Sequence, residues 1–216
     1  MPEPVSLPAA PDSIPADGRT RLLSAAAAEF SRHGFAGASI AAIARAAGVG
    51  KSTVFHHFES KEALYLAVIR EAAVEFGQTL DTVLSTAEDP ATCIATFQHR
   101  HLAHLQRNAE VARLVLRELQ EPASERCLTL VREVLSPNFQ RLVDYLKDAA
   151  AAGLIRADVD AAAAALTLLS ANVLYFQSRE ALSELPGQPL ADDPEAFASA
   201  IADVVFRGLF NRSEHS

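Results

Sequence analysis

The chain has 216 residues, half of them hydrophobic and 21% charged, so it is long enough to bury a sizeable core. Alanine runs recur and stretches of β-branched residues are scarce, which predicts an all-α fold with no sheet. The net charge of −8 argues against a protein coated in nucleic acid, but residues 1–70 carry +1 and residues 71–216 carry −9. This asymmetry suits a small DNA-reading module on a body that phosphate repels.

The two cysteines, Cys93 and Cys127, are too few for a disulfide framework and lack the spacing of a metal site. We therefore expect a reduced, cytoplasmic setting, with no metal and no cofactor. Residues 1–16 contain five prolines and no basic segment followed by an apolar one. They predict a disordered leader rather than a signal peptide.

One stretch approaches the composition of a membrane span. Residues 161–176 are apolar and rich in alanine, but they are fewer than the ~20 residues that a bilayer requires, and polar side chains interrupt them. We interpret this stretch as a buried helix and expect no membrane partner.

The first helices are marked by capping residues. Structure is expected to begin near Asp17, which is placed to cap a helix that Gly34 ends. Ser39 is the next N-cap, and the two-turn helix after it ends at Gly48. A second short helix follows over about 51–58. Two short helices joined by a glycine-containing turn are the physical description of a helix-turn-helix.

Ser60 is placed to cap a much longer helix. Beyond it, breaks marked by proline and glycine divide the chain into further helical stretches. These stretches are expected at about 90–107, 109–120, 123–152, 158–184 and 194–211. The whole chain therefore predicts about nine helices, without an internal repeat.

Residues 39–58 read SIAAIARAAGVGKSTVFHHF, and residues 60–64 read SKEAL. This stretch closely resembles the signature of the TetR family of transcriptional regulators, and the resemblance extends back to Arg19. It covers about 50 residues, and several separated positions agree, which is more specific than one short motif. The resemblance implies a three-helix helix-turn-helix DNA-binding domain over 17–66 and a helical ligand-binding and dimerisation domain over 67–212.

The residues themselves explain the pattern. Small and apolar side chains let the two short helices cross closely and pack on the first helix, and Gly48 supplies the positive φ that the turn requires. The side chains expected to pack in this way are Ile43, Ala44, Ala47, Val49, Val54 and Phe58. The other positions of the second short helix then face outward, where a recognition helix enters a major groove.

The resemblance implies that DNA is contacted by Ser39, Lys51, Ser52, Thr53, Phe55, His56, His57 and Lys61. Lys51 is suited to guanine or phosphate, and the methyl group of Thr53 to a thymine methyl. Lys61 and the backbone N–H groups at Ser39 are better suited to phosphate. For His56 and His57, a structural role is as favoured as a DNA contact, with one of them packed against the first helix.

Three positions depart from the family pattern. Phe55 stands where the family usually has a tyrosine, Gly50 where a serine often caps the recognition helix, and Ala41 where some members make a polar base contact. These departures predict a weaker or differently distributed set of contacts. Arg19 and Arg21 are expected to compensate as a flexible arm on the DNA backbone.

The stretches 158–184 and 194–211 are apolar nearly all round, so both faces of each helix should be buried, which needs a partner in a chain of this size. The resemblance agrees, because family members dimerise through their last two helices. A homodimer would place two recognition helices ~34 Å apart, so the operator should be near-palindromic. From the family we expect a repressor that a small, hydrophobic effector releases from double-stranded operator DNA.

The pocket for this effector is expected among inward-facing side chains of the C-terminal helices. The candidates are Phe97, His101, Leu105, Leu116, Phe139, Tyr145, Asn172 and Phe176, and each taken singly is more often ordinary core. His99, His101 and His104 form a cluster in the sequence. Only His101 and His104 share a helix face, however, and no carboxylate or cysteine completes a metal site.

We expect a binding protein rather than an enzyme, because the sequence contains no glycine-rich phosphate loop, nucleophile elbow or pair of catalytic carboxylates. Two alternatives stay open. An all-helical enzyme or lipid carrier could contain the helix-turn-helix incidentally, or the chain could be a TetR-like activator without an inducer.

Overall fold

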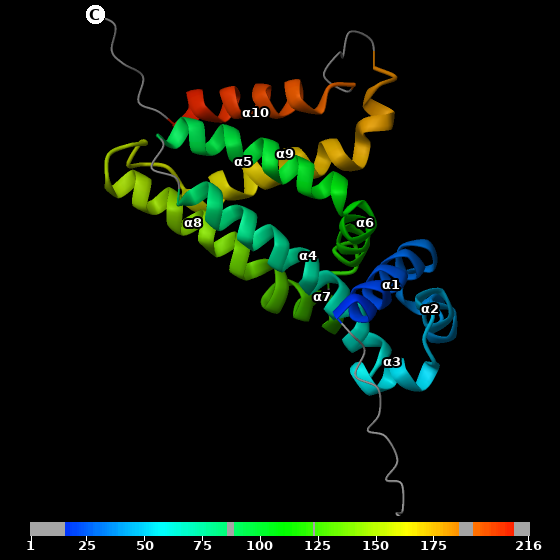
Figure 1. Ribbon diagram of the computed structural model, residues 1–216. Coiled ribbons are helices and arrows are strands. Elements are labelled where there is room, and N and C mark those ends of the chain that lie inside the picture. The colour runs from blue at the N-terminus through cyan, green and yellow to red at the C-terminus, as the bar shows by residue number, and fades with distance from the viewer. Residues whose placement is uncertain (1–15, 86–88, 123, 186–191, 210–216) are drawn as a thin grey trace, which may run out of the picture. The chain divides into compact units, whose positions relative to one another are not determined.

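The computed structural model describes residues 16–85, 89–122, 124–185 and 192–209, and every regular element within these ranges is a helix (Figure 1). The predicted all-α fold is therefore confirmed for the described chain. The chain divides into two compact units, residues 1–65 and residues 66–216. Of the predicted leader, residues 1–15 lie outside the described residues.

The first unit contains three helices and the start of a fourth. They are α1 (Ala16–Gly37), α2 (Ile40–Ala47), α3 (Lys51–His57) and α4 (Lys61–Leu84), which continues into the second unit. α1 begins one residue before the predicted cap Asp17. It is interrupted at Gly34, whose φ of 68° and ψ of 175° are not helical. Gly34 therefore breaks the helix at the predicted position, and the chain then resumes a helical path as far as Gly37.

An aromatic cluster joins the start of α4 to α1. The ring of Phe30 lies 5.1 Å from that of Tyr65 and 6.2 Å from that of Phe35, and Phe35 lies 5.3 Å from Tyr65. Phe30 and Tyr65 are buried, and contacts between ring edges and faces stabilise such clusters beyond their apolar burial. The cluster fixes the first turn of α4 against α1, on which α2 also packs.

The second unit is built from the rest of α4 and the remaining helices. They are α5 (Pro90–Arg107), α6 (Ala109–Glu118), α7 (Glu125–Leu130), α8 (Ser136–Ala151), α9 (Ala161–Leu182) and α10 (Pro194–Leu209). A π-helical segment, η1 (Val131–Leu135), joins α7 to α8 without a break. When α7, η1 and α8 are counted as one continuous helix, the described residues form nine helices, the number that the sequence predicted.

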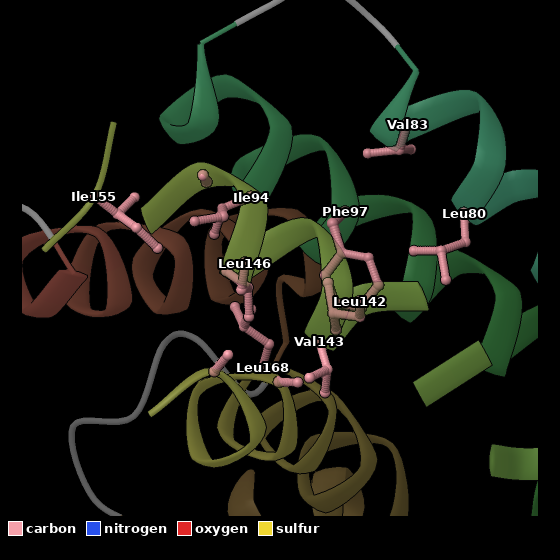
Figure 2. Packing of buried hydrophobic residues seen from close by; sticks show 12 residues of the cluster. Leu80, Val83, Ile94, Phe97, Leu142, Val143, Leu146, Ile155 and Leu168 are labelled. Carbon is pink, nitrogen blue, oxygen red and sulfur yellow. The ribbon is translucent and has the colours of Figure 1, made fainter. Parts of the chain in front are cut away.

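Figure 2 shows an apolar core of the second unit in which side chains from four helices meet. The buried side chains are Leu80 and Val83 of α4, Ile94 and Phe97 of α5, Leu142, Val143 and Leu146 of α8, and Leu168 of α9. Burying one such side chain stabilises the fold by roughly 1.5–3 kcal/mol relative to leaving it exposed. A smaller cluster, in which Tyr175 stacks on Phe197 at 4.1 Å, attaches α10 to α9.

α9 has two features that bear on its predicted need for a partner. It has 22 residues and is the one helix in the described ranges that is long and apolar enough to cross a membrane, although the core helix of a soluble protein passes the same test. In addition, only one face is covered in the single chain. Leu168 and Tyr175 are buried, whereas Leu166 and Leu174 are 59% and 62% exposed. The single chain therefore does not bury both faces of this helix.

Candidate DNA-binding and effector sites

The turn between α2 and α3 has the geometry that its sequence predicts. Gly48 has a φ of 71° and ends α2 in the left-handed region, where its N–H bonds back to the carbonyls of Ala44 and Arg45. Ile43 and Val54 are fully buried, so each short helix turns one apolar face inward. The opposite face of α3 is left for other contacts.

The outer face of α3 presents several of the proposed DNA-contacting side chains. Lys51, Ser52, Phe55 and His56 are exposed, and Thr53 is half-buried. The ammonium group of Lys51 lies 5.8 Å from the centre of the Phe55 ring, a distance at which a cation is attracted to a ring face. Phe55 thus offers an apolar surface suited to a thymine methyl and also steadies the lysine beside it.

His56 and His57 have different surroundings although they are neighbours. Their rings meet edge to face at 5.2 Å. His56 is exposed, whereas His57 is half-buried and its Nε2 is a buried atom without a hydrogen-bond partner in the described structure. Of the two histidines, His56 is therefore the one accessible to a ligand outside the helix.

Ser39 caps α2, as predicted, by accepting a hydrogen bond from the N–H of Ala42 at 3.4 Å. Its own N–H donates to a carboxylate oxygen of Glu29, on α1, at 3.0 Å. This bond occupies an N–H group that the sequence suggested for phosphate, and no local pattern in the sequence indicates it. A phosphate at the start of α2 would have to share the site with a carboxylate, which repels it.

Lys61 is held at the junction of α1 and α4. Its ammonium group donates to the carbonyl of Ala36 at 3.1 Å and lies 5.0 Å from the centre of the Phe35 ring. An ammonium group has three N–H donors, so two remain for a phosphate. Ser60, one residue earlier, caps α4 through a 3.0 Å bond from the N–H of Ala63, as the sequence predicted.

Arg19 and Arg21 do not form an arm. Both lie within α1, which starts at Ala16. The helix therefore begins before the first apolar residues of its buried stripe. The expectation of a flexible arm at these two residues is wrong.

The second unit contains a cavity of about 660 Å³ that α4, α5, α6, η1, α8 and α9 border, and it is open on the side of the exposed Leu166 and Leu174. Its lining is mainly aliphatic and aromatic, and none of its described lining residues is Asp, Glu, Lys or Arg. A cavity of this size and character is typical of sites that bind small apolar molecules. The wall from α4 consists of Ile69, Ala72, Ala73 and Phe76.

The predicted pocket residues lie at different depths around this cavity. His101, Leu105, Leu116 and Phe139 line it. Phe97, Tyr145 and Asn172 do not line it, and Phe97 and Asn172 are buried in the wall behind. Phe176 borders a second, more polar hollow of about 900 Å³, which shares Leu116 and Gln177 with the cavity.

His101 is a buried polar side chain of the cavity wall. Its Nδ1 lies 3.2 Å from the amide nitrogen of Asn172, which also donates to the carbonyl of Gln98 at 3.0 Å. Its ring stacks on Phe97 at 5.5 Å and meets Phe76 at 5.1 Å. Burial, together with the nearby His104, lowers the pKa of His101 to about 3, so the imidazole is neutral at neutral pH.

The other two histidines of the sequence cluster have separate partners. Burial lowers the pKa of His104, against the opposing effect of Glu75, whose carboxylate lies 3.8 Å from its Nδ1. His99 faces α10, with its ring 2.7 Å from the carboxylate of Glu195. In the part of the chain that the structure describes, no group of His, Cys, Asp and Glu side chains could hold a metal ion.

Sequence reasoning missed much of the cavity wall. Val111, Val115 and Leu119 contribute from α6, and Val131 and Leu135 from η1. The α6 residues recur every four positions, so they form one helical stripe that a periodicity search could have found. The contribution of η1 depends on how α7 and α8 pack and has no such signal.

Comparisons with known proteins identify the family of the chain. The description "Bacterial regulatory proteins, tetR family" matches residues 22–68, and "Tetracyclin repressor-like, C-terminal domain" matches residues 90–205. The chain belongs to the TetR family. It is therefore a transcription regulator of TetR type, with a helix-turn-helix DNA-binding domain and a ligand-binding C-terminal domain.

Curated relatives of this TetR-family chain are regulators too. RaaS of Mycobacterium tuberculosis, an HTH-type transcriptional regulatory protein, is 30% identical over 173 residues, which are 76% of this chain and 74% of RaaS. AcnR of Corynebacterium efficiens, an HTH-type transcriptional repressor, is 36% identical over 66 residues. That second match covers 31% of this chain and only 35% of AcnR.

Solved structures share the TetR fold along most of the chain. FadR from Bacillus subtilis in complex with stearoyl-CoA has a TM-score of 0.73 at 16% identity, covering 88% of this chain and 98% of that one. AibR in complex with isovaleryl coenzyme A and operator DNA has a TM-score of 0.68 at 20% identity, with the same two coverages. At such identities the likeness shows the fold alone.

Proposed function

We propose that this TetR-family regulator is a cytoplasmic, homodimeric repressor that is released from a near-palindromic operator by a small, mainly apolar effector, and that it catalyses no reaction. The cavity of about 660 Å³ is the observation on which this proposal mainly rests. FadR and AibR, which share the fold, are described with acyl-CoA molecules, and an effector with an apolar portion would suit this lining as well.

The DNA-binding surface in this proposal is the outer face of α3 with its neighbours. Lys51, Thr53 and Phe55 would read base edges, and Ser52 and His56 would supplement them. Lys61 would contact phosphate and fix the position of the unit on the duplex, and Ser39 would contribute through its hydroxyl group, because its N–H is already bonded to Glu29. His57 has a half-buried ring and is assigned a supporting role.

Release would operate through α4. This one helix carries Lys61 in the first unit and four wall residues of the cavity in the second unit. The first of these wall residues along the helix is Ile69. An effector that presses on this wall acts on the same continuous helix that holds the phosphate-contacting lysine. It can shift operator affinity only by as much as it favours one position of α4 over another.

The homodimer in this proposal forms through α9 and α10. Leu166 and Leu174 of α9 and Val204 of α10 are each more than half exposed in the single chain, and large exposed apolar side chains on adjoining helices mark an interface. Two copies would bring two α3 helices to successive major grooves, which accounts for the expected palindrome.

The test is a titration of duplex DNA from the region flanking the gene, followed by fluorescence anisotropy at two salt concentrations. Lys61→Ala should weaken binding to all duplexes alike and reduce the salt slope by about one phosphate contact. Lys51→Ala or Thr53→Ala should instead erode the preference for the cognate duplex by about 1–3 kcal/mol.

Lys147→Ala is the matched control for the charge change, because Lys147 is an exposed lysine of α8 in the second unit. It should leave both affinity and salt slope unchanged. Equal behaviour of the Lys51, Thr53 and Lys61 variants would contradict the assigned roles, and the absence of any preferred duplex would contradict the function itself.

A further inference from the structure

The cavity of the second unit is neutral as well as apolar. Its described lining residues include amides, hydroxyls and imidazoles but no carboxylate, ammonium or guanidinium group. The two imidazoles, His101 and His104, both have pKa values lowered by burial. An ionised group of a ligand held at the deep end of this cavity, beside the buried His101, would therefore find no counter-ion among the lining residues, which is unfavourable.

Several polar side chains of the lining are already engaged within the protein. The hydroxyl of Ser170 donates to the carbonyl of Leu166 at 2.6 Å. The amide nitrogen of Asn138 donates to the carbonyl of Ala73 at 2.8 Å, and its amide oxygen accepts from Arg141 at 3.0 Å. The Asn138 bond joins α8 to α4 and the Ser170 bond lies within α9, so both groups offer a ligand less than an unengaged donor does.

His101 is different because its tautomer follows from its partners. The nitrogen of the Asn172 amide must face the carbonyl of Gln98, 3.0 Å away, since a carbonyl only accepts. The same nitrogen therefore donates to Nδ1 of the neutral His101 ring, 3.2 Å away. The ring proton of His101 then sits on Nε2, and no hydrogen bond among the described residues engages that atom.

We propose that the effector is uncharged where the cavity holds it and carries a carbonyl-type oxygen that accepts a hydrogen bond from Nε2–H of His101. This inference deepens the proposed function and rests on it. The carbonyl oxygen matches the Nε2–H donor of His101, and the apolar remainder of the molecule matches the aliphatic walls. Asn172 positions the ring, and Phe97 stacks on it, so the donor is fixed before the effector arrives.

The test uses three probes with the same number of carbons: methyl octanoate, which has a carbonyl and no charge, nonane, which has neither, and nonanoate, which is charged. Equilibrium dialysis against the full-length wild-type protein, His101→Phe and Ser170→Ala gives the affinity for each probe. Phenylalanine keeps a ring against Phe97 and removes the Nε2–H donor, together with the Nδ1 acceptor of the Asn172 amide. Ser170→Ala removes a cavity-lining hydroxyl whose proton already has a partner.

We expect His101→Phe to weaken methyl octanoate roughly fivefold and to leave nonane unchanged, since one neutral hydrogen bond is lost. Ser170→Ala should change neither. At about pH 7.5 nonanoate should bind the wild-type protein at least roughly a hundredfold more weakly than the ester, because it must first take up a proton.

Three results would overturn the inference: equal weakening of ester and alkane by His101→Phe, nonanoate binding as tightly as the ester, or retention of no probe by the wild-type protein. None of them bears on operator recognition, which the ligand-free DNA titration decides separately. A regulator that binds its operator but fails these tests keeps the proposed function and loses the assigned effector chemistry.

Discussion

Gly50 begins the recognition helix α3 without a side chain to cap it. Its backbone is extended, with φ −73° and ψ 152°, and an added Cβ would sit at an ordinary 3.5 Å from the hydroxyls of Ser52 and Thr53. A serine therefore fits. We expect Gly50→Ser to raise the free energy of unfolding by a few tenths of a kcal/mol, measured by urea denaturation.

The same substitution should also tighten binding to every duplex by a similar factor, because the new hydroxyl is placed to donate to phosphate rather than to read a base. Gly50→Ala is the control, since it adds the Cβ without the oxygen and should give neither gain. Stabilisation by alanine as well as by serine would show that the effect is steric and not due to capping.

His101 also makes stability depend on acid. Its pKa of about 3 in the folded chain lies below the ordinary value of about 6.5. As the pH falls below about 6.5, the unfolded chain takes up a proton that the folded chain refuses, so stability is lost progressively down to about pH 3. Above about pH 6.5 this group contributes no pH dependence.

Between about pH 7.5 and 5.5, we expect the wild-type protein to lose about 1 kcal/mol more stability than His101→Phe. Urea denaturation at the two pH values measures the difference. The pKa of His104 is lowered too, and its contribution stays in both proteins and cancels in the comparison. The same loss in both would mean that the His101 imidazole is not held neutral by burial.

At the scale of elements, the connection from α6 to α7 depends on a buried ion pair. Glu118 accepts from Nε of Arg126 at 2.8 Å and from the hydroxyl of Ser124 at 3.1 Å, and only 4% of its side chain is exposed. We expect Glu118→Gln to lower the free energy of unfolding by about 2 kcal/mol, because it removes the negative charge from a largely buried, hydrogen-bonded ion pair. Urea denaturation measures this loss.

Glu133 on η1 provides the matched comparison, because it pairs with Arg70 of α4 while both side chains are about half exposed. Glu133→Gln should change stability by less than about 0.5 kcal/mol, since exposed pairs are screened by water. Similar losses in the Glu118 and Glu133 variants would contradict the distinction drawn from burial.

How far the elements follow from sequence depends on whether their signals are local. Ser39 and Ser60 could be predicted as caps, and Gly48 as the turn, because each depends on a few neighbouring backbone groups. The bond from the N–H of Ser39 to Glu29 and the π-helical segment η1 could not, because they arise when segments distant in sequence pack together.

The effector site also has a part that local sequence signals predict and a part that they do not. His101 and Leu105 could be placed on one helix face by their four-residue spacing. Their meeting with Phe76 of α4 and Val131 of η1 across one cavity is a property of the folded unit. Asn172 is a polar residue in an apolar helix, which makes it a predicted pocket residue. In the structure it lies behind His101, to which it is hydrogen-bonded, and does not line the cavity.

At the scale of the whole molecule, two features bear on how copies of the chain assemble. The charge is unevenly distributed along the sequence, and α9 and α10 expose apolar side chains. α9 contributes Leu169 and Val173 to the cavity lining together with the exposed Leu166 and Leu174. One helix thus borders both the effector site and the proposed interface. Dimerisation and effector binding are therefore expected to influence each other's free energies reciprocally.

The proposed interface can be tested at Val204 of α10, which is 66% exposed in the single chain. Val204→Lys leaves the folded chain undisturbed but places one ammonium group from each copy in a desolvated interface, where it has no counter-ion. We expect a monomer at concentrations where the wild-type protein is a dimer, measured by sedimentation equilibrium. Operator affinity should fall with it, because a monomer presents one α3 instead of two.

Val74→Lys is the matched control, because it makes the same substitution in α4, outside α9 and α10. The side chain of Val74 is 60% exposed. The variant should remain dimeric and keep its operator affinity, because a lysine on a solvated helix face meets no partner chain. A dimeric Val204→Lys would place the interface elsewhere on the chain, whereas a monomeric Val74→Lys would move it towards α4. A wild-type monomer would remove the reason for a palindromic operator altogether.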